Sequence, residues 1–421
     1  MALQNESAIR TTLLQAVMKP LQDETMQPLW FLDKIVPDME GLHDIGGTQY
    51  RHYLKIKVGK AGGLGMRGSD GTLPSHTNPS YTEIYFDLAR FYATADIDRM
   101  IRHIKDANRV VDTVVQSAKD IRDGIRYQLN AQFLGDDTAA IARIASTHTA
   151  SATVTCADDG RFPGTRRLRT SVGIDSYNDA VGYGTDTIGA TALTVSSVAS
   201  RTTFVASASV ATADASDYIY WTNSSGTYID AIPMGITAIV DGPLSSDGAT
   251  YTYLEDLFAG DASAYPMWRA YVSDNGGTNR YLDSELIEDA NFQRELNANV
   301  KAGKGDVLLS QGEILLRFRK DEGRDHDWVN KTRITAGVKV VDAMVNGEVI
   351  PWVTDPMVGK GTLFCLRASD LVYKGTPMEV LDSEGWKRVE NKDAMRMQVG
   401  QYAGLGCKRR CSHFVIRDLG E

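Results

Sequence analysis

A glycine-rich hexapeptide is the first stretch of this 421-residue chain whose residue types could do chemistry. Gly63–Gly68 reads GLGMRG, a literal G-x-G-x-x-G, and it follows an expected strand. Such a loop binds a dinucleotide when a helix begins directly after it, because the helix N-terminus meets the pyrophosphate. Here Ser69–Pro74 reads SDGTLP and Pro79 follows, so no helix fits. We therefore expect a loop tip and no bound cofactor.

A second candidate for chemistry is Cys407–His413, CKRRCSH, which could form the corner of a metal site. It lacks C-x-x-C spacing and a second ligand pair, so we expect strand residues around a basic run and no zinc. The chain has four cysteines. They are too few and too scattered for a disulfide framework, which indicates a reducing compartment.

The remaining catalytic patterns are missing. The seven histidines are scattered, and there is no H-E-x-x-H, G-x-S-x-G or Walker A sequence. The charged segment Asp321–Asp327 lacks the spacing of a twelve-residue calcium loop and is expected to be a solvated loop. The sequence therefore predicts no catalytic residue, no metal and no enzyme.

Two basic clusters, Arg166–Arg169 and Lys408–Arg410, could meet DNA phosphates or the carboxylates of a neighbouring subunit. The net charge of −9 makes a nucleic-acid grip unfavourable over most of the surface. We therefore favour a neighbour's carboxylates as the partners of both clusters.

The elements that would position these residues are organised around a long helix expected over Thr94–Gly135. Its apolar residues recur mostly every three or four positions, the period of one helix face. Oppositely charged i,i+4 pairs lie on the other face. The apolar positions of this spine helix are Ile97, Ile101, Ile104, Val111, Val115, Ala118, Ile121, Ile125, Leu129 and Phe133.

A long β-hairpin is expected ahead of the spine, with strands Tyr50–Val58 and Tyr81–Tyr92 and a Gly-rich tip, Gly59–Ser80. Lysines on the first strand and carboxylates on the second are compatible with antiparallel pairing. A two-stranded ribbon is marginal in water and needs a surface such as another subunit. We expect assembly contacts from Lys55, Lys57, Arg67, Glu83 and Asp87.

The first 40 residues read as an extended arm with a short helix near Ser7–Met18 and three prolines. Trp30 and Phe31 lie among these prolines and are expected to bury against this subunit or a neighbour. No basic region precedes the short apolar patch near the N-terminus, so we expect no secretory signal. No apolar run reaches the length of a membrane span.

Two further regions complete the expected architecture. Ser146–Gly260 is rich in Ser, Thr, Ala and Gly and predicts a small β-barrel or sandwich, with strands near 192–195, 203–205, 217–221 and 236–240. Leu282–Val300 predicts a helix capped by Asp283. Its expected buried side is Leu286, Ile287, Ala290, Leu296 and Val300.

An α+β unit follows that helix. Asp306–Leu309 predicts a strand and Glu313–Arg319 a short helix opened by a capping-box pattern. Asn346-Gly347 between two apolar runs is a strong hairpin signal. Further strands are expected over 361–366, 371–373, 395–399 and 413–416, and a strand near the C-terminus is expected to return to the spine.

The order of these elements resembles the major capsid proteins of tailed bacteriophages, the HK-ninety-seven fold. The likeness rests on the hairpin Tyr50–Ala93 feeding into Asp96–Leu134, on DVLLS at Asp306–Ser310, and on Val345–Met357 with Gly361–Phe364. The resemblance implies an α+β major-capsid fold with an N-terminal arm, a long E-loop hairpin, a spine helix, an A-domain and an inserted β-rich domain. The implied divisions are 1–45 arm, 46–93 E-loop hairpin, 94–148 P-domain with the spine, 149–260 inserted domain, 261–305 P-domain continuation, 306–384 A-domain and 385–421 return to the P-domain.

The resemblance also implies a function. The expected role is a self-assembling subunit of the icosahedral shell around double-stranded phage DNA, located in the virion and assembled in the host cytoplasm. Expected partners are copies of itself in hexamers and pentamers, a portal, a separate scaffolding protein and decoration proteins, with DNA on the inner face without sequence readout. No membrane partner and no intersubunit crosslink are predicted. The alternatives are an encapsulin-like compartment with protein cargo and an enzyme whose β-rich insertion is a substrate domain.

Overall fold

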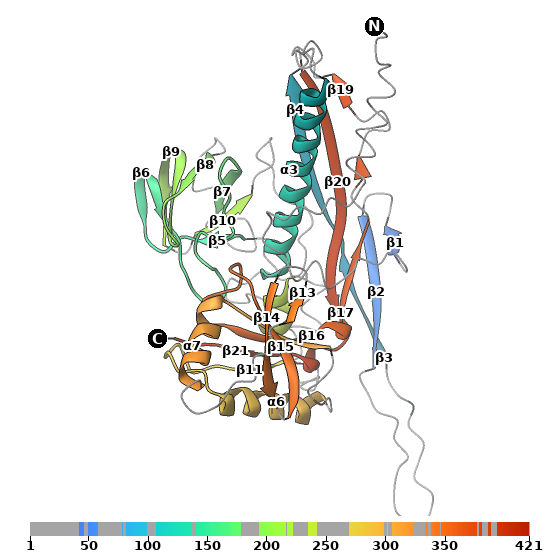
Figure 1. The fold of residues 1–421 in the computed structure, drawn as a ribbon, viewed down its shortest axis with the longest axis vertical. Coiled ribbons are helices and arrows are strands. Elements are labelled where there is room, and N and C mark those ends of the chain that lie inside the picture. The colour runs from blue at the N-terminus through green and yellow to red at the C-terminus, as the bar shows by residue number, and fades with distance from the viewer. Residues whose placement is uncertain are drawn as a thin grey trace, which may run out of the picture.

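The computed structural model contains four sheets and one long helix in the part of the chain that it describes (Figure 1). The described residues are 42–45, 49–57, 78, 81–98, 107–136, 140–177, 193–215, 217–221, 235–241, 269–298, 301, 305–322, 333–335, 338–345, 347–376, 379–380, 386–388 and 394–420. The expected arm, apart from residues 42–45, its helix near Ser7–Met18 and nearly all of the hairpin tip lie outside these residues.

The spine is helix α3 (Ala107–Phe133), which lies along strands β4 (Ala89–Asp98) and β20 (Ala394–Cys407) (Figure 1). Its apolar residues Ile121, Ile125, Leu129 and Phe133 are buried as expected. The helix prediction is wrong for Thr94–Asp98, which belong to β4 and pair with β20 from Ala89↔Ala403 to Asp98↔Ala394. Backbone bonds to a partner 300 residues away override the local helical spacing, so a ten-residue strand separates the hairpin from the spine.

Strand β20 is the centre of its sheet. One edge pairs with β4, and the other pairs in succession with three short strands, β17 (Leu371–Gly375), β18 (Glu379–Val380) and β19 (Trp386–Arg388). Strand β20 therefore returns to the spine as the sequence predicts. Strand β21 (Phe414–Ile416) instead joins a different sheet.

The predicted hairpin is confirmed, but its return strand ends at Asp87, and residues 89–92 belong to β4, which pairs with β20. Strands β2 (Gln49–Lys57) and β3 (Tyr81–Asp87) pair antiparallel, and β1 (Leu42–Ile45) adds a third strand on the outer edge of β2.

The inserted region forms one six-stranded sheet in the order β5-β10-β7-β8-β9-β6. The two edge strands of this sheet are β5 and β6. Ile144, just after β5, forms a β-bridge with Cys156, just after β6, so the edges meet and the sheet closes into a small barrel. A barrel was one of the two predicted forms. The expected strand at Ile236–Val240 is instead a helix, because a short apolar run cannot be assigned by periodicity. The elements are β5 (Ala142–Arg143), β6 (His148–Thr155), β7 (Gly173–Tyr177), β8 (Leu193–Val198), β9 (Thr203–Ala213), β10 (Tyr218–Trp221) and α4 (Ile236–Asp241).

The α+β unit is built on a seven-stranded sheet in the order β11-β21-β16-β12-β15-β14-β13. The predicted hairpin at Asn346-Gly347 is confirmed by the pairing of β14 with β15, and Gly347 has a φ of 81°, which favours glycine. The elements are β11 (Tyr271–Ser273), α6 (Ser284–Ala298), β12 (Asp306–Ser310), α7 (Gly312–Glu322), β13 (Arg333–Thr335), β14 (Val338–Val345), β15 (Glu348–Thr354), β16 (Leu363–Arg367) and β21.

The two faces of this sheet belong to different cores. Leu309, Val353 and Phe364 point into the large cluster shared with the spine and the inserted barrel. On the opposite face, Leu308 and Trp352 pack with residues of α6 and α7. The seven-stranded sheet therefore has one side turned to the rest of the subunit and one side covered only by these two helices in the described structure.

Helix α6 begins as predicted, because the Asp283 carboxylate accepts a hydrogen bond from the Leu286 N–H at 2.8 Å. Its buried side is the predicted one at Ile287 and Ala290, and Leu286 is partly buried against the same core, but Leu296 is exposed and Val300 lies outside the described residues. Asn291, Arg294 and Ala298 complete the inward side. The buried pairing of Arg294 with Asp306 rotates the inward face toward polar residues.

Candidate assembly surfaces and the junction behind them

The base of the hairpin is anchored to β20. Phe86 and Leu54 are buried, and a Cβ added to Gly406 of β20 would lie 2.3 Å from the Phe86 ring. Only glycine fits at this point of contact, since real Cβ atoms do not approach other atoms so closely. The opposite face of the hairpin carries Arg51, whose guanidinium carbon lies 3.7 Å from the Tyr85 ring centroid.

The predicted hairpin contacts can be placed by register. Lys55 lies opposite Glu83, Asp87 lies opposite Arg51, and Lys57 lies opposite Tyr81. The complementary charges therefore alternate across the ribbon itself, as the sequence predicts, and their role in assembly stays a prediction. Trp30, Phe31 and Arg67 lie outside the described residues.

A buried arginine joins the spine, the inserted barrel and the seven-stranded sheet. Arg167 donates from Nε and Nη2 to the Met357 carbonyl at 3.1 and 2.9 Å, and from Nη2 to the Leu134 carbonyl at 3.0 Å. Burial lowers the pKa of Arg167 to about 10, so it remains charged at neutral pH. The expectation that this arginine meets a neighbour or DNA is wrong, because its guanidinium is buried and donates its hydrogen bonds to carbonyls of its own subunit.

Asp355 completes this junction from the end of β15. Its carboxylate accepts from the Asn130 side chain in the last turn of the spine at 3.2 Å and from the Met357 N–H at 2.8 Å. Burial raises the pKa of Asp355. The two hydrogen bonds, and the positive charge of nearby Arg167, oppose that shift. The spine end and the loop after β15 are therefore held at fixed positions relative to each other.

A cluster of charged side chains reinforces the same junction at the surface. Arg201 of the barrel binds the Asp158 carboxylate at 2.5 Å, the Gln311 side chain at 2.9 Å and Glu313 of α7. Arg166 reaches Glu313 at 3.5 Å. The hydrogen bond from Arg201 lowers the pKa of the Glu313 carboxyl.

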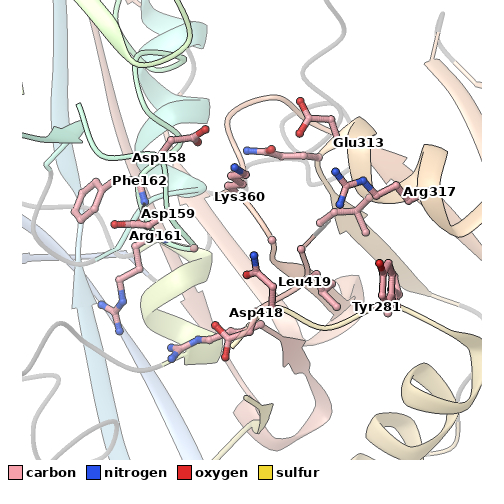
Figure 2. A pocket seen from close by; sticks show the side chains of 18 of the residues that line it. Asp158, Asp159, Arg161, Phe162, Tyr281, Glu313, Arg317, Lys360, Asp418 and Leu419 are labelled. Atoms are coloured by element: carbon pink, nitrogen blue, oxygen red, sulfur yellow. Dashed lines mark hydrogen bonds between the residues drawn. The ribbon is translucent and has the colours of Figure 1, made fainter. Parts of the chain in front are cut away.

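Beside this cluster lies a cleft of about 680 Å³ between the barrel root, α7 and the C-terminal residues (Figure 2). Its lining contains no Ser, Thr, Cys or His among the described residues. Its carboxylates are engaged: Asp159 with Arg143 at 2.7 Å, and Asp418 with the backbone N–H groups of Asn275 and Gly277. These contacts brace the barrel root and the C-terminal residues within the subunit.

The Cys407 and His413 pair also belongs to the core. Cys407 Sγ lies 3.3 Å from His413 Nε2, while His413 Nδ1 accepts from the Arg367 N–H at 3.0 Å. Burial lowers the pKa of His413 to about 3 and raises that of the Cys407 thiol, the reverse of what a reactive cysteine requires. All four cysteines are free and buried.

The basic run in this segment is likewise used inside the chain. Arg409 donates to the Ala298 carbonyl at 2.7 Å, and buried Arg410 donates to the Ile239 carbonyl. The prediction of an intermolecular role is therefore wrong for Arg410. Within the described segments, no group of three or more His, Cys, Asp and Glu side chains is placed to hold a metal. None of the helices in those segments combines the length and apolarity of a membrane span.

The outer sides of α6 and α7 carry exposed large apolar side chains. Phe292 and Leu296 project from α6, and Leu316 projects from α7.

The charged segment predicted as a loop at Asp321–Asp327 begins inside α7, which continues to Glu322. Sequence reasoning missed the Arg167 and Asp355 junction and the outward apolar side of α6. Asp355-Pro356 directly after an apolar strand was the available signal for the junction.

Comparison with known proteins identifies the fold. No protein-family model and no curated protein sequence matches this chain. The cyanophage A-1(L) capsid subunit matches with a TM-score of 0.53 and 16% identity over 95% of both chains. A subunit from the capsid of an empty GTA particle matches at 0.48 and 11% over 96% of both chains. An encapsulin complex from Synechococcus elongatus matches at 0.37 and 10%, covering 100% of this chain and 96% of its own. The cyanophage match, with the spine, hairpin and seven-stranded sheet described above, identifies an α+β fold of the phage capsid, HK-ninety-seven type.

Proposed function

We propose that this chain is the major capsid protein of a tailed phage, which assembles into an icosahedral shell around double-stranded DNA. The observation that carries the proposal is the fold likeness to a cyanophage capsid subunit over 95% of both chains. The internal joints agree with this role, because a shell subunit must transmit contacts through a rigid body. Arg167, Asp355 and Arg201 brace the three parts of the subunit against each other.

The proposed partners follow from this role. Copies of the chain would form hexamers and pentamers, with the predicted hairpin residues Lys55, Lys57, Glu83 and Asp87 and the arm residues Trp30 and Phe31 as contacts. A portal, a separate scaffolding protein and decoration proteins would complete the particle in the host cytoplasm. DNA would lie on the inner face of the virion shell without sequence readout, since the chain carries a net charge of −9.

Expression of the chain alone and with its neighbouring genes, followed by sedimentation and electron microscopy, tests the proposal. We expect closed shells, and particles from the native source should protect double-stranded DNA from nuclease. Shells that hold a protein cargo and no DNA would support an encapsulin-like compartment instead. Turnover or ligand-dependent stabilisation of an isolated monomer would support an enzyme.

Deleting residues 62–79, the expected hairpin tip, tests the mechanism of assembly. We expect a folded subunit that assembles poorly, because the tip would lose its neighbour. Circular dichroism and thermal unfolding check the fold, and sedimentation measures assembly. Normal shells from the deletion variant would remove the tip from the mechanism.

A further inference from the structure

Helix α6 exposes two large apolar side chains although two of its polar side chains are buried. Phe292 and Leu296 are 52% and 59% exposed, whereas Asn291 and Arg294 are fully buried. At about 100° per residue, the exposed residues lie in one stripe along the helix. We call this the α6 stripe, and its members are Glu285, Glu288, Asp289, Phe292 and Leu296.

Helix α7 carries a second stripe on its outer side. Leu316 is 65% exposed, and Arg319 and Lys320 follow it on the same side, also exposed. We call Leu316, Arg319 and Lys320 the α7 stripe. Both helices pack their inner sides on the same face of the seven-stranded sheet, through Ile287 and Ala290 of α6 and Leu315 and Phe318 of α7. Both stripes therefore point away from the body of the sheet.

The charges alone have a simple explanation within each helix. Acidic residues near a helix N-terminus and basic residues near a C-terminus complement the helix dipole. The exposed apolar residues have no such explanation. A helix that needs only its own subunit turns Phe and Leu inward, so the α6 stripe indicates a partner surface.

The two stripes match each other in chemistry and spacing. On α6 the acidic pair Glu288 and Asp289 precedes Phe292 by three to four residues. On α7 the basic pair Arg319 and Lys320 follows Leu316 by the same three to four residues. In an antiparallel crossing, about 5 Å along each axis separates the apolar contact from the charged contact on both helices. In that crossing, Phe292 contacts Leu316 at one point, and one turn further along both helices the carboxylates contact the basic pair.

We propose that the α6 stripe of one subunit binds the α7 stripe of the next copy of this chain. The contact is heterologous, because the two surfaces differ, and repeated contacts of this kind close a ring around a rotation axis. The inference rests on the proposed shell function and names the partner surfaces within it. The occupant is a second copy rather than another protein because the chain itself carries the complementary charge and apolar side chain.

A charge swap tests the pairing. Glu288→Lys with Asp289→Lys should lower the sedimenting, assembled fraction roughly tenfold, because like charges then face each other. Arg319→Glu with Lys320→Glu should do the same, and all four changes together should restore assembly. Glu288→Gln with Asp289→Asn should have a smaller effect than reversal. Asp214→Lys changes an exposed charge of the inserted barrel, outside both stripes, and should leave assembly unchanged.

A cysteine pair tests the contact without changing charge. Phe292→Cys combined with Leu316→Cys should form a ladder of disulfide-linked subunits in oxidised shells. Each single variant should not, and neither should the wild type, whose four cysteines are buried. Crosslinking by Phe292→Cys alone would identify a symmetric α6 contact and overturn the proposal.

The outcomes separate this inference from the proposed function. If the wild type forms shells while the swaps change nothing and the cysteine pair does not crosslink, the stripe pairing is wrong and the shell function stands. If the wild type never assembles, the shell function fails and this inference fails with it.

Discussion

The inner side of helix α6 has a buried ion pair beside its apolar residues, whereas the outer side has two exposed large apolar side chains beside its charges. On the inner side, Arg294 donates to the Asp306 carboxylate at 3.1 Å and to the Asn291 side chain at 2.5 Å, all of them buried. On the outer side, Phe292 and Leu296 face outward. Buried ion pairs contribute little net stability but are costly to break, so the inner side fixes the position of the helix. The outer side then presents apolar residues in a defined geometry.

The same contrast divides the seven-stranded sheet. One face is tied to the spine and the barrel through Arg167 and Asp355, and the other is covered by α6 and α7. Changes at the internal side should therefore lower stability, whereas changes at the outer side should alter assembly with the fold intact.

Breaking the inner side of α6 should have the largest effect. Arg294→Met leaves the Asp306 carboxylate buried without its cation, and we expect the free energy of unfolding to fall by about 3–5 kcal/mol. Urea unfolding of the unassembled subunit measures this loss. Arg319→Met on the exposed side of α7 is the matched control and should cost less than about 0.5 kcal/mol. Equal losses in the two variants would remove the distinction between the sides.

Breaking the junction should have the next largest effect. Arg167→Met leaves the Met357 and Leu134 carbonyls without their donor, and the unfolding free energy should fall by about 2–3 kcal/mol. The control is Arg166→Met, whose partly exposed ion pair with Glu313 should contribute under about 1 kcal/mol. If Arg166→Met costs as much as Arg167→Met, the buried bonds are not what holds the three parts together.

The inner side should also respond to pH through His413. Burial, with Arg294, Arg410 and Arg367 nearby, lowers its pKa to about 3. The unfolded value is about 6.5. Between these values the unfolded chain binds a proton that the folded chain does not, so stability falls as pH drops below about 6.5. His413→Gln should reduce the stability difference between pH 7.5 and pH 5.5 by about 1.4 kcal/mol, measured by urea unfolding. An unchanged difference would show that His413 is not held neutral.

The outer side should have the smallest effect on stability. Phe292→Ser with Leu296→Ser should change the unfolding free energy by about 0.5 kcal/mol or less per site, because both side chains are already exposed. Sedimentation should nevertheless report a loss of assembly. A large loss of stability would mean that these residues belong to the core of their own subunit.

The sequence pattern correctly predicted elements whose formation depends on residues close together in the chain. Apolar spacing predicted α3, and Asn346-Gly347 predicted the β14–β15 hairpin. Thr94–Asp98 were misassigned because β20, which pairs with them, lies 300 residues away. On α6, Ile287 and Ala290 were assigned correctly to the inward side, but Leu296 was not, because the buried pairing of Arg294 with Asp306 is not identifiable from helix spacing. Arg167 is indistinguishable in sequence from its neighbour Arg166. The carbonyls that accept hydrogen bonds from Arg167, those of Leu134 and Met357, come from distant parts of the chain and are not evident from the local sequence.

Electron cryomicroscopy of the purified chain, assembled alone or with its gene neighbours, would show the proposed packing at the level of single helices. We expect closed icosahedral shells in which seven-stranded sheets surround the rotation axes and α6 of one subunit lies against α7 of the next. Soluble monomers or dimers under every condition would rule out a shell subunit.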